Sequence, residues 1–147
     1  GLLYNMETKG QLSKPVFITT KQLEPGIRVN MHLKVHSVEV TRERMTYDGE
    51  MQRYANVVVG DEHGCCNLYA KNEQLDVIKK GAVITVRNCH ANVFQEHLRL
   101  EVDKWGKIEA SSQNIPSVNL SVNHSDVEYE LVPVNKNGSG SRRRNYA

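Results

Sequence analysis

Apolar residues recur at every second position in several short segments of this chain. In the clearest case, Leu98, Leu100 and Val102 alternate with charged neighbours, and residues 65–71 show the same pattern. Because side chains of a β-strand point alternately to opposite faces, such a segment buries one face and exposes the other. The chain is therefore predicted to be all-β.

The order of these segments narrows the architecture. A long first strand follows the Glu24-Pro25-Gly26 turn, and four further strands are expected at about 53–60, 65–71, 82–90 and 98–102. A short helix is expected between the third strand and the fourth, capped by Asn72 and stopped at Gly81. This order is that of the five-stranded Greek-key barrel called the OB-fold.

The first strand shows a shift in its alternation. Leu33 and Val35 lie on one face, but after Ser37 the apolar positions move to Val38 and Val40. An extra residue in one strand, a β-bulge, produces such a shift and lets a long strand bend around a small barrel. Residues 41–52, which hold an Asp-Gly turn, are expected to form an exposed loop.

One domain is expected. Of the 147 residues, 39% are hydrophobic, which is enough for a single core of ordinary size. The barrel is placed at residues 15–110, after a polar, flexible segment at 1–14. Residues 111–135 form a C-terminal extension whose last part alternates well enough to add an edge strand, which leaves open whether it packs on the barrel. Residues 136–147 are expected to be a disordered basic tail.

The cysteines and the apolar runs bear on the compartment. Cys65, Cys66 and Cys89 make an odd count that suits a reducing compartment, and we expect them in the core or the sheet. No apolar run approaches the ~20 residues of a membrane span, and the first residues do not resemble a signal peptide. We therefore expect an intracellular protein, nuclear or cytoplasmic, with no membrane contact.

Catalytic and metal-binding patterns are absent from the sequence. There is no phosphate-binding glycine loop, no nucleophile elbow and no CxxC pair, and the histidines and cysteines do not have the spacing of a zinc site. The chain is therefore predicted to be a binding protein and not an enzyme, without a cofactor or metal.

Aromatic and cationic residues gather on the exposed side of the predicted strands. An OB barrel binds a single strand through a groove that follows the phosphates and through planar groups that stack on bases. We expect such a nucleic-acid site to be formed by Tyr54, Asn67, Tyr69, Lys71, Arg87, His90, Phe94 and Arg99, extended by Arg42 and Arg44. The alternative is that these side chains only keep the barrel surface soluble.

Two aromatic residues near the fifth strand are interpreted differently. Phe94 lies in a predicted polar loop at residues 91–96, where it either stacks on a base or packs beneath the loop. Trp105 follows the last strand and precedes Gly106, and we expect it to be a packing residue that closes the barrel.

Several short motifs resemble a known family. They are Lys14-Pro15-Val16-Phe17, Gln22-Leu23-Glu24-Pro25-Gly26, Gly60-Asp61-Glu62-His63-Gly64, Lys80-Gly81, Val93-Phe94 and Val102-Asp103-Lys104-Trp105-Gly106-Lys107-Ile108. They are similar to those of small eukaryotic OB-fold proteins related to replication protein A, and to the OB subunit of the human sensor of single-stranded DNA complex. The resemblance covers about residues 14–110 and implies an OB-fold that binds single-stranded nucleic acid.

The resemblance also implies which positions would stack on bases. In the human subunit four aromatic residues do so, and the one in the loop matches Phe94. The other three positions fall on Lys71, His90 and Glu101, of which Lys71 and Glu101 cannot stack in the same way. The resemblance therefore implies an altered stacking surface.

Two functions follow from these observations. The first is binding of single-stranded DNA or RNA in the barrel groove. The second is a protein-protein adaptor, which would use the same barrel face or residues 127–132 to hold a partner within a larger complex.

Overall fold

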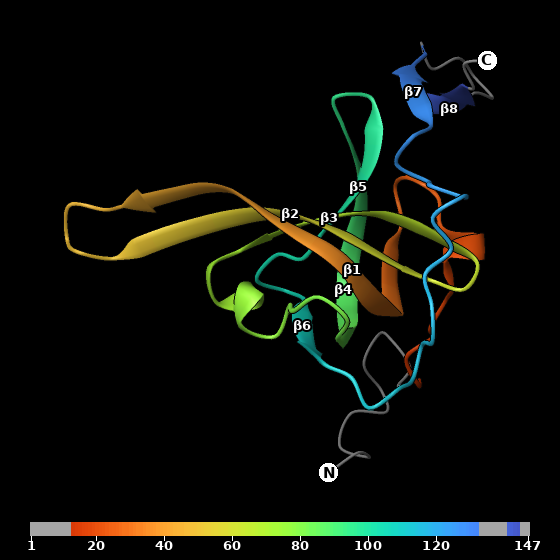
Figure 1. Ribbon diagram of the computed structural model, residues 1–147. Coiled ribbons are helices and arrows are strands. Elements are labelled where there is room, and N and C mark those ends of the chain that lie inside the picture. The colour runs from red at the N-terminus through yellow and green to blue at the C-terminus, as the bar shows by residue number, and fades with distance from the viewer. Residues whose placement is uncertain (1–12, 133–140, 145–147) are drawn as a thin grey trace, which may run out of the picture.

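Strands make up most of the fold, as the computed structural model shows (Figure 1). The structure describes residues 13–132 and the backbone of residues 141–144. Its strands are β1 (Arg28–Met45), β2 (Met51–Asp61), β3 (Gly64–Lys71), β4 (Val83–Phe94), β5 (His97–Glu101), β6 (Lys107–Ala110), β7 (Glu128–Leu131) and β8 (Ser141–Arg144). Two 3-10 helices, η2 (Thr20–Gln22) and η3 (Asn72–Asp76), accompany them. Neither helix of the described part is long and apolar enough to cross a membrane.

Five of the strands pair in a closed ring. β1 pairs antiparallel with β2 and β4, and β2 pairs antiparallel with β3. β3 lies parallel to β5, which pairs antiparallel with β4 and completes the ring. This is the topology of an all-β OB-fold. Three further strands lie outside the ring: β6 pairs with β4, β7 with β5, and β8 with β7. Of these, the sequence allowed only an edge strand at the end of residues 111–135, where β7 lies.

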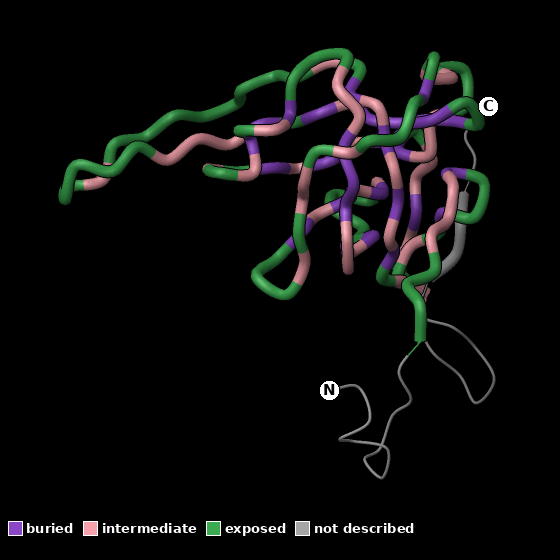
Figure 2. Tube along the Cα trace, turned by 90° about the horizontal axis from the view of Figure 1, so that it is seen from below, coloured by how far each residue is buried: buried purple, intermediate pink, exposed green. Residues whose placement is uncertain are grey.

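The core lies inside this ring, where alternate residues of each strand are buried (Figure 2). Leu33, Val57, Leu68 and Leu100 are among the side chains with no exposed surface. The three cysteines are free and buried, as the sequence predicts. Burial raises the pKa of the Cys66 thiol well above its ordinary value and that of the Cys89 thiol to about 12.

The predicted bulge in β1 is confirmed, because the pairing with β2 shifts register between Val35 and Ser37. The expectation of a loop at residues 41–52 is wrong. β1 and β2 stay paired from Arg42 opposite Tyr54 to Met45 opposite Met51, after a second register shift between Val40 and Arg42. This pair of strands, residues 41–54, forms an arm that projects from the barrel and is mostly exposed (Figures 1 and 2).

Two further boundaries differ from the prediction. β4 continues to Phe94 and turns directly into β5, so residues 91–96 are a hairpin and not a loop. Gln95 and Glu96 form its turn with φ of 50° and 73°, a conformation that the sequence does not signal because Asn and Gly are its usual residues. The element between β3 and β4 is the five-residue 3-10 helix η3, which includes Asn72 instead of being capped by it.

The C-terminal extension lies against the barrel. Ile115, Ser125 and Tyr129 are buried, and the Ser125 hydroxyl donates to the Leu98 carbonyl at 2.6 Å and accepts from the Asn67 N–H at 2.9 Å. β8 pairs with β7, which corrects the expectation of an unstructured tail for residues 141–144. The other residues of the predicted tail, and residues 1–12, lie outside the described part of the chain.

Candidate functional site

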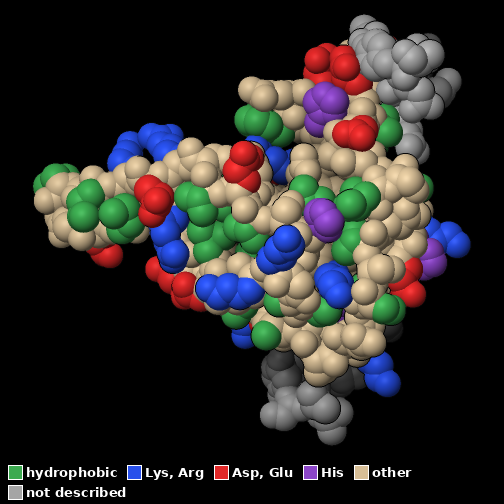
Figure 3. Space-filling model, in the orientation of Figure 1, with side chains coloured by type: hydrophobic (Ala, Val, Ile, Leu, Met, Phe, Trp, Pro, Cys, Tyr) green, Lys and Arg blue, Asp and Glu red, His purple; other side chains and the backbone are tan. Residues whose placement is uncertain are grey.

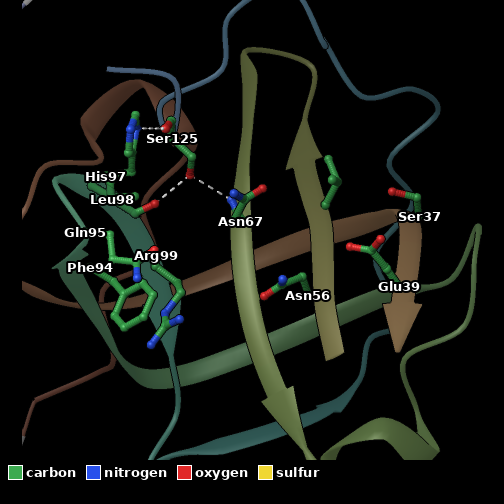
Figure 4. A pocket seen from close by; sticks show the side chains of 11 residues that line it. Ser37, Glu39, Asn56, Asn67, Phe94, Gln95, His97, Leu98, Arg99 and Ser125 are labelled. Atoms are coloured by element: carbon green, nitrogen blue, oxygen red, sulfur yellow. Dashed lines mark hydrogen bonds between the residues drawn. The ribbon is translucent and has the colours of Figure 1, made fainter. Parts of the chain in front are cut away.

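A groove of about 680 Å³ opens on the outer face of β2, β3 and β5 (Figure 4). β1 contributes Ser37 and Glu39, the β4–β5 hairpin contributes Phe94, Gln95 and Arg99, and the floor includes Asn56 of β2 and Asn67 of β3. These residues alternate with buried core residues, so the same period of two that builds the core presents them on the outside. Ser125 of the extension forms one wall of the groove. Its hydroxyl accepts a hydrogen bond from the backbone N–H of Asn67 and so holds that residue in place.

Arg99 lies between two aromatic rings at this groove. Its guanidinium carbon is 3.6 Å from the centroid of the Phe94 ring and 4.5 Å from that of Tyr69. Glu101 holds the guanidinium through contacts of 2.8 and 3.2 Å, and the Arg99 side chain is only 17% exposed. We call these four residues the Arg99 cluster. Within it Phe94 remains 45% exposed.

The line of planar groups continues onto the arm. The Tyr69 and Tyr54 rings stack with centroids 6.2 Å apart and planes 14° apart, because Tyr54 lies diagonally across the β2–β3 pair from Tyr69. The guanidinium carbon of Arg42 lies 5.7 Å from the centroid of the Tyr54 ring. Arg44 is two residues farther along β1, opposite Gln52, and so lies beyond this line.

Two smaller hollows adjoin the cluster at the other end of β3. One, of about 220 Å³, is lined by Tyr69, Lys71, His90 and Glu101 among others. The imidazole Nε2 of His90 lies 2.8 Å from a carboxylate oxygen of Asp103. The pKa of Asp103 is held below its usual value, first by the backbone N–H of Trp105 and then by His90.

The other hollow, of about 490 Å³, holds Trp105. It shares Lys71, Gln74, Val102 and Asp103 with its neighbour and adds Asn72, Glu73, Lys104 and Trp105. We call these eight residues the Trp105 hollow. Trp105 is 70% exposed, so the prediction that it packs to close the barrel is wrong. It lies in the tight turn between β5 and β6, where no strand covers it.

Arg87 does not join the predicted site. It lies on the part of β4 that faces β6, with its guanidinium carbon 5.2 Å from the Phe17 ring and its Nε 2.8 Å from a Glu109 oxygen. Phe17 in turn stacks on His32, with centroids 4.4 Å apart and planes 5° apart. We call these four residues the Arg87 cluster. Arg87 pairs with Lys107 of β6, whereas His90, beyond the bulge at Asn88, pairs with Glu101 of β5, so the two side chains have different neighbours.

Charge around the groove is mixed, and Figure 3 shows basic and acidic side chains interspersed over the arm and the barrel. Among the described residues, no group of three or more histidine, cysteine or acidic side chains could hold a metal ion. The site therefore offers planar rings, amides and single cations in place of a metal or a strongly basic field.

Sequence reasoning missed several groove residues. Asn56 and Gln95 line the groove, and Ser125 reaches it from the extension. The alternation of β2 signals that Asn56 faces outward beside Tyr54, whereas no local pattern signals that Ser125, far along the chain, reaches the same site.

The comparisons with known proteins agree with this topology. A family model described as single-stranded DNA binding protein Ssb-like, OB fold, matches residues 23–110. The chain belongs to this family. The match covers the ring of five strands together with β6, so the arm, the Arg99 cluster and Trp105 all lie within the Ssb-like domain.

Relatives extend the likeness beyond that domain. An uncharacterized Arabidopsis thaliana protein is 35% identical over 131 residues, which is 82% of this chain and 86% of the relative. The solution structure of a hypothetical protein from the same plant has a TM-score of 0.68 at 34% identity and covers 87% of this chain and 97% of its own. A replication factor A related protein from Methanobacterium thermoautotrophicum shares the fold, with a TM-score of 0.52 at 19% identity over 66% of this chain and 92% of its own.

Proposed function

We propose that the protein binds single-stranded nucleic acid, DNA or RNA, along the groove and the Arg99 cluster, and acts by binding and not by catalysis. The observation that carries this proposal is the Arg99 cluster itself. Three strand segments bring a guanidinium and two rings together beside an open groove, and Phe94 stays 45% exposed there. An exposed ring beside a groove of this size is a surface on which a base can stack.

The contact between Arg99 and Phe94 prepares the ring for stacking. A guanidinium 3.6 Å from the ring centroid occupies one face, and Glu101 keeps the guanidinium in place. The ring is therefore oriented before a ligand arrives, which lowers the entropy that binding must overcome. Each base stacked on an aromatic ring contributes about 1–3 kcal/mol without demanding a particular sequence.

The groove floor supplies polar groups for the edges of bases and for sugars. Asn56, Asn67 and Gln95 line it, and each amide offers both a donor and an acceptor. The backbone bond from Asn67 to Ser125 holds that part of β3 in place. Such groups can tolerate many sequences, and they can also meet a ribose 2′-hydroxyl, so RNA and DNA are both compatible ligands.

Cations at the ends of the line of rings are suited to phosphates. Arg42 lies against Tyr54 and Lys71 lines both smaller hollows, while Arg44 extends the row along the arm. Glu39 and Glu101 lie in the same region. We therefore expect stacking to contribute more than charge, and a shallow dependence of affinity on salt.

The relatives support the same class of ligand. The family description names single-stranded DNA binding, and one structural neighbour is related to replication factor A. Neither fact assigns a ligand to this chain, since one fold serves many functions.

Fluorescence anisotropy with labelled oligo(dT) and oligo(U), at low and at physiological salt, tests the proposal. We expect saturable binding to at least one of the two at micromolar protein or below. No binding to either would overturn the proposal.

A protein-protein adaptor is the second candidate, and the arm favours it. Its residues Met45, Tyr47 and Met51 are large and apolar and are 49% exposed or more. Exposed apolar side chains gathered on one element are typical of protein contacts. Failure of both oligonucleotides to bind would favour this function.

A further inference from the structure

The groove and the Trp105 hollow are linked through the Arg99 cluster and the small hollow, and we call this series the track. Arg99 of the groove contacts Tyr69, and Tyr69 lines the small hollow, which shares Lys71, Gln74, Val102 and Asp103 with the Trp105 hollow. A single strand that leaves Phe94 across Tyr69 therefore reaches the small hollow and, next to it, Trp105.

Trp105 is presented on a turn with a well-defined conformation. Its backbone N–H donates to Asp103 at 2.9 Å, and its carbonyl accepts from the Asn88 side chain at 3.1 Å. Gly106 follows so closely against β4 that a Cβ atom there would lie 2.5 Å from the Arg87 carbonyl oxygen. These backbone contacts hold the turn without using the indole, which stays 70% exposed.

The neighbours of Trp105 complete a nucleotide site. Lys104 places its ammonium 5.1 Å from the indole ring, and Lys71 lines the same hollow. Gln74 donates to the Val102 carbonyl at 2.8 Å and accepts from the Lys71 N–H at 3.0 Å, which ties η3 to this end of the track. A large exposed ring beside the Lys104 ammonium, in a hollow that Lys71 also lines, suits a base together with its phosphate.

We propose that Trp105 is a second stacking platform, which binds a nucleotide of the same single strand at the end of the track opposite Phe94. This inference rests on the proposed function and extends it from a groove to a longer site. Lys104 and Lys71 contact the phosphates on either side of the stacked base.

The chain itself supplies the probe, because Trp105 is its one tryptophan. Unlabelled protein is titrated with labelled oligo(dT) or oligo(U) of increasing length, and the anisotropy of the label and the emission of Trp105 are recorded together. We expect oligonucleotides long enough to span the track to quench the emission, with the same midpoint as the anisotropy.

Substitutions make the test specific. Trp105→Ala should weaken binding of the long oligonucleotides about 5- to 150-fold, the loss expected for one stacked base. The length at which affinity stops rising should also become shorter. Trp105→Phe should restore much of the affinity. Leu120→Ala, which removes another large exposed apolar side chain away from the track, is the matched control and should change nothing.

The outcomes separate the two proposals. Anisotropy that reports binding while the Trp105 emission stays constant at every length would overturn this inference and leave the proposed function intact. Unchanged affinity of a folded Trp105→Ala variant would do the same. No anisotropy change with any oligonucleotide would overturn both.

Discussion

Two of the arginines that lie against aromatic rings, Arg99 and Arg87, each belong to a cluster, yet only the Arg99 cluster borders the groove. In the Arg99 cluster the guanidinium covers one side of Phe94, and the ring stays 45% exposed. In the Arg87 cluster Phe17 has Arg87 on one side and is stacked on His32. The same residue types thus leave an exposed ring in one place and a half-buried ring in the other.

The acids that hold the two arginines explain this difference. Glu101 is two residues from Arg99 on the same strand, β5. Their ion pair therefore orients the Arg99 side chain but does not connect β5 to another strand. Glu109 lies on β6, and its 2.8 Å contact with Arg87 joins β4 to β6. The comparison indicates that the Arg87 cluster stabilises the barrel and that the Arg99 cluster is available for a ligand.

The aromatic residues give the largest expected contrast. Phe94→Ala should weaken oligonucleotide binding by about 1–3 kcal/mol with little change in thermal stability, because a stacking surface is lost and no core is opened. Phe17→Ala should instead lower the free energy of unfolding by about 1–3 kcal/mol and leave affinity unchanged, because its ring contacts lie within the fold. Anisotropy and thermal denaturation of both variants measure the contrast.

The opposite result would contradict the separate roles assigned to the two clusters. If Phe94→Ala lowers the melting temperature but binds normally, the Phe94 ring is a packing residue. The groove would then lose its best stacking surface.

The arginines give the next contrast. Arg99→Met should weaken binding by about 0.5–2 kcal/mol, the range for a cation on an aromatic ring, because Phe94 loses the group that orients it. Arg87→Met should leave binding unchanged and lower stability by at most ~1 kcal/mol, since its ion pair with Glu109 is partly exposed. Arg99→Lys should recover little, because an ammonium does not stack as a guanidinium does. Equal effects of the two Met variants on affinity would contradict the assignment of separate roles.

The barrel could be predicted from the sequence because one face of each strand is buried. The alternation around Leu68 and Leu100 records the inside and outside of the ring directly. The phase shift at Ser37 marks the bulge, although Val38 and Val40 beyond it are 36% and 51% exposed. The arm lacks this alternation of buried and exposed positions. Residues 41–54 are largely exposed on both faces, so charged residues occupy both sets of positions and the segment resembles a loop.

The site was predictable where it follows the same alternation. Tyr54, Asn67 and Tyr69 face outward for the reason that their neighbours face inward. Arg87 was misplaced because β6, which supplies Glu109, was not predicted, and Trp105 because a tryptophan is expected to be buried. Ser125 reaches the groove through a long-range contact with Asn67, which only the tertiary structure reveals.

Charge gives a smaller contrast between the two regions. Lys71 lies at the end of the line of rings, whereas Lys107 pairs with Glu109 beside the Arg87 cluster. Lys71→Ala should reduce the slope of log affinity against log salt by about 0.7, the value for one phosphate contact on a single strand. Lys107→Ala should leave the slope unchanged. Anisotropy titrations at several salt concentrations give both slopes, and an unchanged slope for Lys71→Ala would remove Lys71 from the phosphate contacts.

The smallest effect concerns His32, which lies within the Arg87 cluster. Burial, and after it the positive charge of Arg87, lowers the pKa of His32 below its ordinary value of 6.5. Between the lowered pKa and 6.5 the unfolded chain binds the proton more readily than the folded one. The part of the free energy of unfolding that depends on His32 is therefore fully present above pH 6.5, and it is lost as the pH falls toward the lowered pKa.

An NMR titration of the His32 ring separates the two causes. In the native protein its midpoint should lie below 6.5, and in Arg87→Met it should rise part of the way back, because the charge is gone while the burial remains. Arg99→Met is the matched control and should leave the midpoint where it is, since Arg99 belongs to the other cluster. A midpoint that moves with Arg99 and not with Arg87 would show that the two clusters are not electrostatically separate, and the division of roles between them would fail.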